Sequence, residues 1–383
     1  MASVLRLKKG RERALEHPWI FKGDVADVSA APGDVVTVVE ASGRFVGRGF
    51  YNPRPALCCR ILTRQDEPVD RAFFERRIGG AVARRDGADV ARLVWSEGDG
   101  LPGLVVDRYG PVLVVQCLTL GMTRVRNDIV AILRDALGDL AVFLRDDEVG
   151  ATLEGFEPIR GWAGPPGPES LAVAEGPVKL QVTFAAGQKT GMYLDQAENR
   201  QRIGPLAAGA VVLDAFSYTG GFACHAMVGG AERVVCIESS PDAIAGARAN
   251  LELNGVLDRA EIVPTNVFDE LRRLDHERQQ FGLIVLDPPP FARSRTAVDA
   301  AARGYKEINL RAMRLLAPGG ILATFSCSHH ISEALFTEIA RDAAADAGVT
   351  LRVLETLTQS ADHPVLLSVP ETQYLKGLLL EAV

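Results

Sequence analysis

The chain has 383 residues, of which 47% are hydrophobic and 24% charged, and its net charge is −7. This length and composition are typical of a folded protein with two or three domains, and they exclude a disordered chain or a disulfide scaffold. The longest apolar runs fall well short of the ~20 residues that a membrane-spanning helix needs, and residues 1–13 lack the apolar core of a signal peptide. We therefore expect a cytoplasmic protein that does not bind membranes.

Positive charge gathers near the N-terminus. Residues 1–85 contain 16 Lys and Arg against 10 Asp and Glu, although the whole chain contains 42 against 49. A basic segment on an acidic body indicates that a polyanion binds at one end, and a solvated surface with chance asymmetry is the alternative. The residues that we expect to contribute to such binding are Arg11, Arg13, Lys22 and Arg48.

Short β-type runs separated by turn residues fill residues 35–62 and predict a small β-barrel domain over residues 1–69. Trp19 and Phe21 lie just before these runs and are spaced to share one face of a strand. We expect both rings to belong to the barrel core, with stacking on nucleic acid bases as the alternative.

Residues 70–178 mix helical and strand-like patterns. The expected helices are 71–87 and 124–140, and the expected strands are 103–110, 111–120 and 141–147. No motif of known chemistry occurs here, so this part is predicted to be a spacer or a binding platform. The Gly- and Pro-rich residues 161–170 mark a loop or boundary.

Strands and helices alternate over residues 179–383, which predicts an α/β domain with a doubly wound parallel sheet. The expected strands are 210–216, 233–239, 260–266, 282–289, 320–326 and 351–357. In such a sheet the ligand lies at the carboxyl ends of the strands. Pro241 and Gly255 match the start and stop signals of the helix between the second and third strands.

The ends of the first three strands predict an adenosine-containing ligand. After Asp214 a glycine-containing loop, 216–221, leads into a helix, so that a ligand can approach the backbone and the helix N-terminus. Glu238 follows Gly220 by 18 residues, near the offset of ~20 at which an acid binds ribose hydroxyls. Asn266 stands where the adenine edge would lie. Because a pyrophosphate-binding motif and a P-loop lysine are missing, S-adenosylmethionine is preferred to NAD or ATP.

The fourth and fifth strands end in Asp287 and Cys327. The prolines after Asp287 would hold the carboxylate rigidly beside the cleft, and Phe291 could stack on a planar substrate, with a turn of no function as the alternative. Because successive strands of such sheets are often neighbours, we expect Cys327 to lie next to Asp287.

Cys327 is followed by His329 and His330, which invites a metal site or a protease-like nucleophile. A metal would need further ligands at suitable spacing, and nucleotide-type strand ends have no role in a cysteine protease, so both are disfavoured. A buried structural thiol is the remaining alternative. The six cysteines are expected to be reduced and mostly buried. For His329, His330 and His363 a structural role is favoured over catalysis.

Five motifs in one order carry a family resemblance. They are GQKTGMYLDQ (187–196), FSYTGGF (216–222), LDPPPF (286–291), FSCSHH (325–330) and ADHPVLLSVPETQYLKG (361–377). Over nearly its whole length the chain resembles the bacterial large-subunit (23S) ribosomal RNA cytosine-C5 methyltransferases. The resemblance implies a PUA domain at 1–69, an EEHEE domain with linker at 70–178 and a class I methyltransferase domain at 179–383.

The resemblance also implies the reaction, in which 5-methylcytosine forms in large-subunit ribosomal RNA. Cys327 would be the nucleophile, and Asp287 would stabilise charge on the ring. The implied contacts of S-adenosylmethionine are Lys189, Thr190, Asp214, Phe216, Ser217, Tyr218, Thr219, Gly220, Gly221, Glu238, Ser239, Asn266, Val267 and Asp287. No metal is implied, and a homodimer stays open.

Two positions depart from the family pattern. Asn266 replaces a common Asp, which changes the adenine contact without removing it. Pro290 stands where many members have a basic residue and where many RNA cytosine-5 methyltransferases have a second cysteine, so a single-cysteine mechanism is implied. The alternatives are methylation of an exocyclic amine or ring nitrogen without a thiol, and a non-catalytic RNA-binding or ribosome assembly factor.

Overall fold

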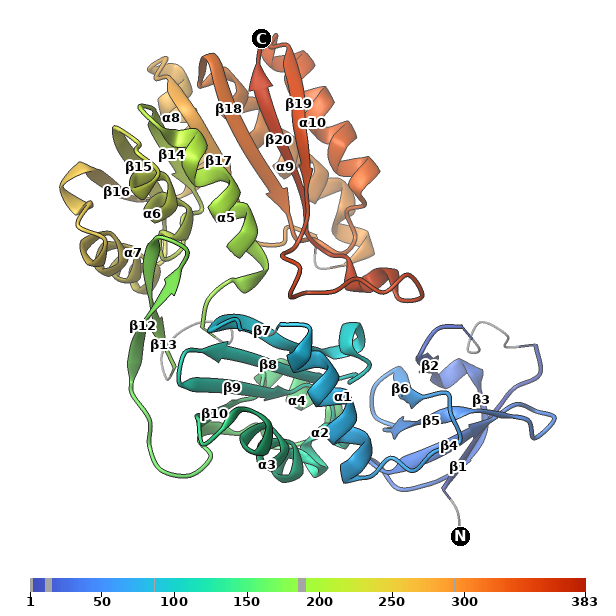
Figure 1. Ribbon diagram of the computed structural model, residues 1–383. Helices are drawn as coiled ribbons and strands as arrows, with labels where there is room; N and C mark the ends of the chain where they lie inside the picture. The colour runs from blue at the N-terminus through green and yellow to red at the C-terminus, as the bar shows by residue number, and fades with distance from the viewer. Residues whose placement is uncertain (1–2, 11–15, 86, 185–190, 293) are drawn as a thin grey trace. The chain divides into compact units, whose positions relative to one another are not determined.

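The computed structural model describes residues 3–10, 16–85, 87–184, 191–292 and 294–383 (Figure 1). They form two compact units, called here the N-terminal unit (Met1–Leu171, Val182–Leu194 and Asp362–Thr372) and the C-terminal unit (Ala172–Gln181, Asp195–Ala361 and Gln373–Val383). Within the described ranges, no helix has the length and apolar character needed to cross a membrane.

The N-terminal unit begins with a six-stranded sheet in the order β2-β6-β5-β4-β1-β3. Its strands are β1 (Val4–Leu7), β2 (Trp19–Phe21), β3 (Val25–Ser29), β4 (Val35–Val39), β5 (Phe45–Tyr51) and β6 (Leu57–Thr63). β1 and β4 pair in parallel, and the other neighbours are antiparallel. The β-type runs predicted within residues 35–62 are β4, β5 and β6, which confirms a small β domain at this end of the chain.

The aromatic pair on β2 does not belong to the core, and that prediction was wrong. Ile20 between the two rings is fully buried, whereas Phe21 is 47% exposed and Trp19 is half-buried. Trp19 Nε1 donates to Glu97 Oε1 at 2.8 Å, and the Arg60 guanidinium lies 5.7 Å from the ring centroid. Since side chains alternate along a strand, the inward position of Ile20 turns both neighbours outward.

A five-stranded sheet in the order β11-β10-β9-β8-β7 completes the N-terminal unit. Its elements are α1 (Arg71–Ala83), β7 (Val90–Trp95), β8 (Leu104–Tyr109), β9 (Val112–Cys117), α2 (Leu120–Arg124), α3 (Arg126–Leu137), β10 (Ala141–Arg145), α4 (Glu148–Glu154) and β11 (Arg160–Trp162). Phe50 and Leu62 from the first sheet are buried in one cluster with Phe73 and Leu93 of this part. The two sheets therefore share a hydrophobic core.

The segment Asp362–Thr372, close to the end of the sequence, belongs to the N-terminal unit. Arg85 Nη2 donates to the carbonyl oxygen of Asp362 at 2.6 Å, and the backbone amide of Arg92 donates to the Asp362 carboxylate at 2.8 Å. His363 is buried, with Nδ1 2.6 Å from Asp362 Oδ1 and its ring centroid 5.0 Å from that of Trp95. These contacts give His363 a structural place in the fold.

The C-terminal unit is built on a seven-stranded sheet in the order β16-β15-β14-β17-β18-β20-β19. Its strands are β14 (Val211–Ala215), β15 (Arg233–Glu238), β16 (Ala260–Pro264), β17 (Phe281–Leu286), β18 (Leu316–Ser326), β19 (Leu351–Leu357) and β20 (Lys376–Ala382). β14 to β18 are parallel, and β20 runs antiparallel to β18 and β19. The predicted doubly wound sheet is confirmed, and its last strand, β20, was not predicted.

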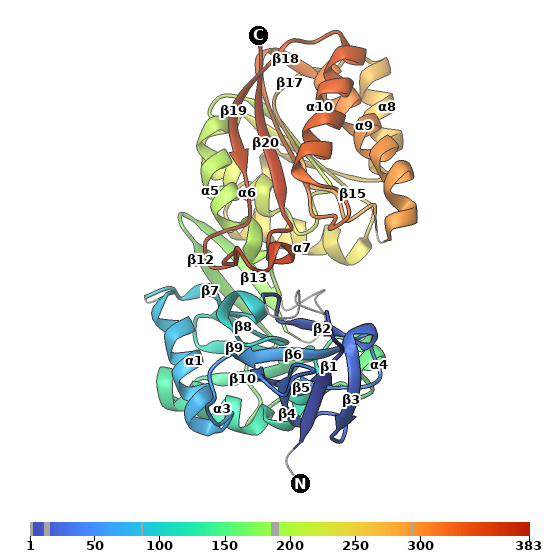
Figure 2. The same ribbon diagram turned by 90° about the vertical axis from the view of Figure 1, so that its right-hand side faces the viewer.

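Helices cover both faces of this sheet: α5 and α6 lie on one side and α8, α9 and α10 on the other (Figure 2). The helices are α5 (Ala197–Ile203), α6 (Gly221–Val228), α7 (Pro241–Leu253), α8 (Val267–His276), α9 (Val298–Arg314) and α10 (Glu333–Ala347), and a small hairpin, β12 (Ser170–Glu175) and β13 (Val178–Thr183), precedes them in the chain. As predicted, Pro241 begins α7, and Gly255 beyond its end has a left-handed φ of 67°.

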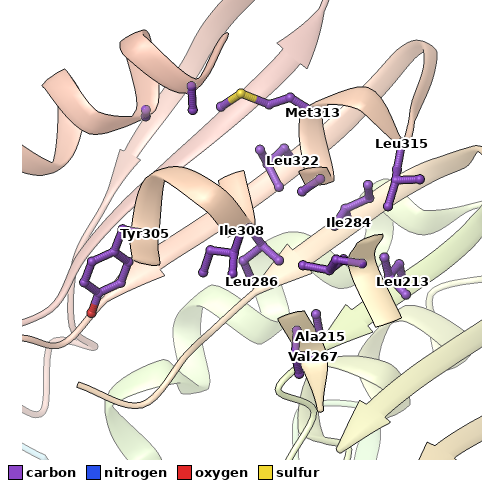
Figure 3. Close-up of a cluster of buried hydrophobic side chains, with 14 of the residues drawn as sticks. Leu213, Ala215, Val267, Ile284, Leu286, Tyr305, Ile308, Met313, Leu315 and Leu322 are labelled. Carbon is purple, nitrogen blue, oxygen red and sulfur yellow. The ribbon is translucent and has the colours of Figure 1, made fainter. Parts of the chain in front are cut away.

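Buried side chains from the central strands and α9 form the core that fixes the ends of those strands (Figure 3). The residues that meet there are Leu213, Ile284, Leu286, Tyr305, Ile308, Met313 and Leu322. Because protein cores are packed as densely as organic crystals, the strand ends are held at defined positions.

Candidate active site

The order of the parallel strands reverses at β14, which has β15 on one side and β17 on the other. Ligands of doubly wound sheets bind at the carboxyl ends of the strands next to such a reversal. Asp214 lies in β14, Glu238 ends β15, and Asn266 follows β16. Asp287 and Cys327 directly follow β17 and β18. The structure therefore brings these predicted residues to one edge of the sheet.

The loop between β14 and α6 has an unusual backbone. Phe216 and Tyr218 have positive φ angles of 64° and 48°, and Gly220 has 75°. The amides of Phe216 and Ser217 both donate to the carbonyl oxygen of Ile237, each at 3.1 Å. Non-glycine residues in this region cost about 1–3 kcal/mol each and persist only where their surroundings hold them, most often at ligand sites.

Glycines allow close packing at the start of α6. A side chain at Gly220 would place its Cβ 3.3 Å from the Cβ of Ala247, and one at Gly221 would lie 3.0 Å from Cδ of Arg200. Asn250 Nδ2 donates to the carbonyl oxygen of Thr219 at 2.8 Å. α5 and α7 thus hold the loop in place behind the ligand edge.

Asp214 is a buried carboxyl group, only 1% exposed. Its Oδ2 accepts from the amide of Ala223 at 3.0 Å, whereas Oδ1 has no partner in the part of the chain that the structure describes. Burial, together with the charges of Asp287 and Glu238, raises the pKa of Asp214 to about 8. The hydroxyl of Ser217 is likewise buried. Such groups suit a ligand that brings hydrogen-bond donors or positive charge.

Glu238 is fixed by backbone amides. Its Oε2 accepts from Tyr218 at 3.0 Å, and its Oε1 accepts from Ser239 and Ser240 at 2.7 and 2.9 Å. A carboxylate has about four acceptor sites, so capacity remains for a ribose hydroxyl. The rigid carboxylate fits the role predicted for it.

Asn266 is the N-cap of α8, and its Oδ1 accepts from the amide of Phe268 at 2.9 Å. Its oxygen is therefore engaged, and the amide nitrogen is the group that it can offer to an adenine ring. Val267 is the buried first residue of α8. The predicted contacts Lys189 and Thr190 lie outside the residues that the structure describes.

The carboxylate of Asp287 is oriented by α5 and the segment before it. Gln196 Nε2 donates to Asp287 Oδ1 at 3.0 Å, and Gln196 Oε1 accepts from Asn199 Nδ2 at 2.6 Å. Both amide side chains are buried. Sequence reasoning missed them, although Gln196 is the last residue of the motif GQKTGMYLDQ.

Cys327 is partly exposed, whereas the other five cysteines are buried. Leu286 pairs with Thr324, so β17 and β18 deliver Asp287 and Cys327 to the same edge. Cys327 Sγ lies 3.8 Å from the carbonyl oxygen of Pro288. Cys327 was predicted to lie next to Asp287, and its sulfur contacts the residue that follows Asp287.

Phe291 is packed against protein rings. Its ring centroid lies 4.6 Å from that of Tyr305, 5.8 Å from that of Phe268 and 6.2 Å from that of Phe216. These contacts fasten the turn after β17 to α8 and α9. They disfavour the predicted role of Phe291 as a stacking platform for a substrate.

A buried lysine near Cys327 was not predicted as a site residue. Lys376 Nζ donates to the carbonyl oxygen of Ser328 at 2.8 Å, and Ser328 Oγ lies 2.9 Å from the hydroxyl of Tyr305. Burial lowers the pKa of Lys376 to about 8. The side chains of His329 and His330 are exposed. Across the described ranges, no three His, Cys, Asp or Glu side chains are grouped so as to hold a metal ion.

A buried ion network lies behind the loop between β14 and α6. The Arg200 guanidinium pairs with both oxygens of Glu175, at 2.7 and 2.6 Å, and His225 Nε2 lies 2.9 Å from Glu175 Oε1. Burial alone would raise the pKa of Glu175, but the charge of Arg200 and the hydrogen bonds hold it down at about 2. The network ties β12 to α5 and α6.

Comparison with known proteins adds two family matches. Residues 159–380 match the S-adenosylmethionine-dependent methyltransferases, and residues 5–64 match the PUA-like domain. Ribosomal RNA large subunit methyltransferase I of Klebsiella pneumoniae (strain 342) is 42% identical over 97% of this chain and 96% of its own length. The protein of that name from Escherichia coli O127:H6 is 40% identical over 98% of each chain. The crystal structure of SMU.776 complexed with SAH superposes with a TM-score of 0.85 over 100% of both chains, at 19% identity.

Proposed function

Since the chain belongs to the S-adenosylmethionine-dependent methyltransferases, in the family of ribosomal RNA large subunit methyltransferase I, we propose that it methylates carbon 5 of a cytosine in large-subunit ribosomal RNA through a covalent bond to Cys327. The observation that carries this proposal is the position of the thiol. Cys327 Sγ lies 3.8 Å from the carbonyl oxygen of Pro288, one residue from Asp287. A partly exposed thiol beside an oriented carboxylate is what covalent activation of a cytosine ring requires.

The residues at the sheet edge fit S-adenosylmethionine, which when bound supplies a methyl group on a positively charged sulfur. We assign Asp214 Oδ1 to its ammonium group, because this buried oxygen has no partner among the described residues. Glu238 would accept from the ribose hydroxyls, and the Asn266 amide nitrogen would donate to a ring nitrogen of adenine. The remaining cofactor residues predicted from the sequence stay part of this proposal.

Covalent activation explains why a thiol is needed. Carbon 5 of cytosine is a poor nucleophile, and addition of the Cys327 thiolate to carbon 6 turns it into an enamine-like carbon that can accept a methyl group. Asp287 would donate to or protonate ring nitrogen 3 and hold the exocyclic amine, which stabilises the charge that develops in the ring. Gln196 keeps the Asp287 carboxylate in the orientation that this contact needs.

Replacement of Cys327 tests the proposal. We expect Cys327→Ala to lower methyl transfer to ribosomal RNA by at least about a thousandfold, as loss of a nucleophile does in other enzymes. Binding of the cofactor should be unchanged, since the thiol makes no contact assigned to it. Transfer would be followed with a radioactive methyl donor, and the product would be located by bisulfite sequencing of ribosomal RNA with and without the gene.

The outcomes separate the competing functions. Full transfer by the Cys327→Ala variant, with the methyl group on an exocyclic amine or ring nitrogen, would exclude the covalent mechanism. If the wild-type protein transfers no methyl group to any fraction of ribosomal RNA, a non-catalytic RNA-binding or assembly role replaces the proposal. RNA that carries 5-fluorocytosine should form a stable covalent adduct with the wild-type protein and not with Cys327→Ser. Release of the enzyme requires loss of the proton on carbon 5, and the fluorine atom that replaces this proton cannot leave in the same way.

A further inference from the structure

We propose that Lys376 is the positioning residue that holds Cys327 as a thiolate, both before it attacks the base and when it leaves. This inference rests on the cytosine-C5 chemistry proposed above and adds to it the group that controls the proton of the nucleophile. It also explains how one cysteine can both attack and leave, since Pro290 stands where many RNA cytosine-5 methyltransferases have a second cysteine.

The sheet register brings the lysine to the thiol. In the antiparallel pair of β18 and β20, Lys376 lies opposite Ser326, and its Nζ donates to the carbonyl oxygen of Ser328 at 2.8 Å. The side chain therefore reaches from the level of Ser326 to the backbone of Ser328, the residue that follows Cys327. An ammonium group held at this place favours the charged form of a nearby thiol.

The ammonium group has a fixed position. Lys376 is 6% exposed and Ser328 is fully buried. Ser328 Oγ is 2.9 Å from the Tyr305 hydroxyl and accepts from the amide of Ala292 at 3.3 Å. Lys376 thus donates to a backbone segment that α9 and the turn after β17 hold in place, so its charge stays at the residue next to Cys327.

Three other charged and titratable groups lie on the segments around the pair. They are Asp287 after β17, Tyr305 on α9 and Glu333 on α10. Burial lowers the pKa of Lys376 to about 8, and the negative charges of Cys327 and Glu333 act in the opposite direction. An ordinary thiol has a pKa of ~8.5, and a positive charge close to it lowers that pKa and so favours the thiolate.

The proton and electron balance follows from this pair. The Cys327 thiol gives its proton to solvent water, and the thiolate, stabilised by the ammonium group of Lys376, forms the bond to carbon 6. After carbon 5 has gained the methyl group, it gives its own proton to solvent water. The bond between carbon 6 and sulfur then breaks, and its electrons return to sulfur beside the ammonium group, which stabilises the leaving thiolate.

The test is the pH dependence of alkylation of Cys327 by iodoacetamide in the full chain without RNA, with Cys327→Ser as background. The five buried cysteines have pKa values raised by burial, so they contribute little signal. We expect Lys376→Met to slow alkylation about tenfold near neutral pH and to raise its midpoint by about one unit. Lys376→Arg should restore most of the rate, and the exposed Lys179→Met should match the wild type.

Equal rates for wild type and Lys376→Met near about pH 10, where the thiolate forms in both, would show that the variant keeps its site. An unchanged midpoint in Lys376→Met would overturn the inference. If that variant does not fold, the pKa of Cys327 can be measured in the wild type from the thiolate absorbance as a function of pH, after subtraction of the absorbance of Cys327→Ser. A Cys327 pKa at or above ~8.5 would contradict the proposal. Alkylation needs no methyl transfer, so this result is independent of whether Cys327→Ala abolishes activity.

Discussion

Asp214 shows how one buried side chain can link cofactor binding to pH. Its pKa is raised to about 8, chiefly by burial, so below that pH the free protein holds it in the neutral form. A cationic ligand favours the ionised form, and its binding should therefore release a proton and become tighter as pH rises toward 8.

We predict release of a substantial fraction of one proton when S-adenosylmethionine binds between about pH 6 and 7, where the α-amino group of the cofactor itself keeps its proton. Calorimetry in two buffers with different ionisation enthalpies measures this number. Asp214→Asn should abolish the release. If wild type and Asp214→Asn release equal numbers of protons, Asp214 is not the group that meets the positive charge.

At the scale of elements, the ion network of Glu175, Arg200 and His225 ties β12, α5 and α6 together behind the loop between β14 and α6. Removing one partner of a buried ion pair leaves an uncompensated charge and costs about 3–5 kcal/mol. We expect that loss in the free energy of unfolding for Glu175→Ala, measured by urea denaturation near neutral pH. The matched control is Glu355→Ala, whose exposed pair with Arg202 should contribute less than about 1 kcal/mol.

The same network should respond to acid. The pKa of Glu175 is lowered to about 2 in the folded protein, so its stabilisation is present above the unfolded value of ~4.3 and is lost as pH falls from there toward 2. The difference in stability between wild type and Glu175→Ala should shrink over this range. A difference that stays constant down to about pH 3 would mean that Glu175 is not the titrating partner.

The limits of sequence prediction are clearest for individual elements. Strands β14 to β18 were predicted because buried parallel strands are continuous apolar runs between turn signals. β20 was missed, since a short apolar run beside a chain end fits a helix as well as a strand. On β2 the spacing of Trp19 and Phe21 was right, but alternation alone does not say which face is buried.

Site residues divide in a similar way. The positions of Asp287 and Cys327 at the edge of the sheet could be predicted because each directly follows a recognisable strand. Gln196 and Lys376 could not, because their contacts join residues 91 and 48 positions apart, to Asp287 and Ser328 respectively. Only the folded sheet and the helix beside it bring such pairs together.

At the scale of the whole molecule, the basic N-terminal part is where RNA affinity should depend on charge. Lys22 is exposed and its Nζ donates to the carbonyl oxygen of Arg54, whereas Arg48 pairs with Asp66 at 2.5 Å. Arg11 and Arg13 lie outside the described residues. Since Asp66 already offsets part of the charge of Arg48, we expect Lys22→Gln to weaken RNA binding more than Arg48→Gln.

Log affinity falls as log salt concentration rises, and removing a cation that binds one phosphate should make this slope shallower by about 1. The affinity for the cofactor should stay the same. Filter binding of ribosomal RNA fragments over a salt series measures both variants, with Lys179→Gln as the control from the C-terminal unit. Unaltered RNA affinity of Lys22→Gln at low salt would contradict this prediction.

The segment Asp362–Thr372 has a consequence for how the protein is made. Domains that are continuous in sequence can fold one after another as synthesis proceeds, the N-terminal one first. Here the N-terminal unit includes Asp362–Thr372, and Arg85 and Arg92 can meet Asp362 only after the 277 and 270 residues that separate them from it have been synthesised. The first unit to emerge is thus completed only after most of the C-terminal unit has been made, so a chain cut before residue 362 would lack both a finished first unit and the strand that carries Lys376.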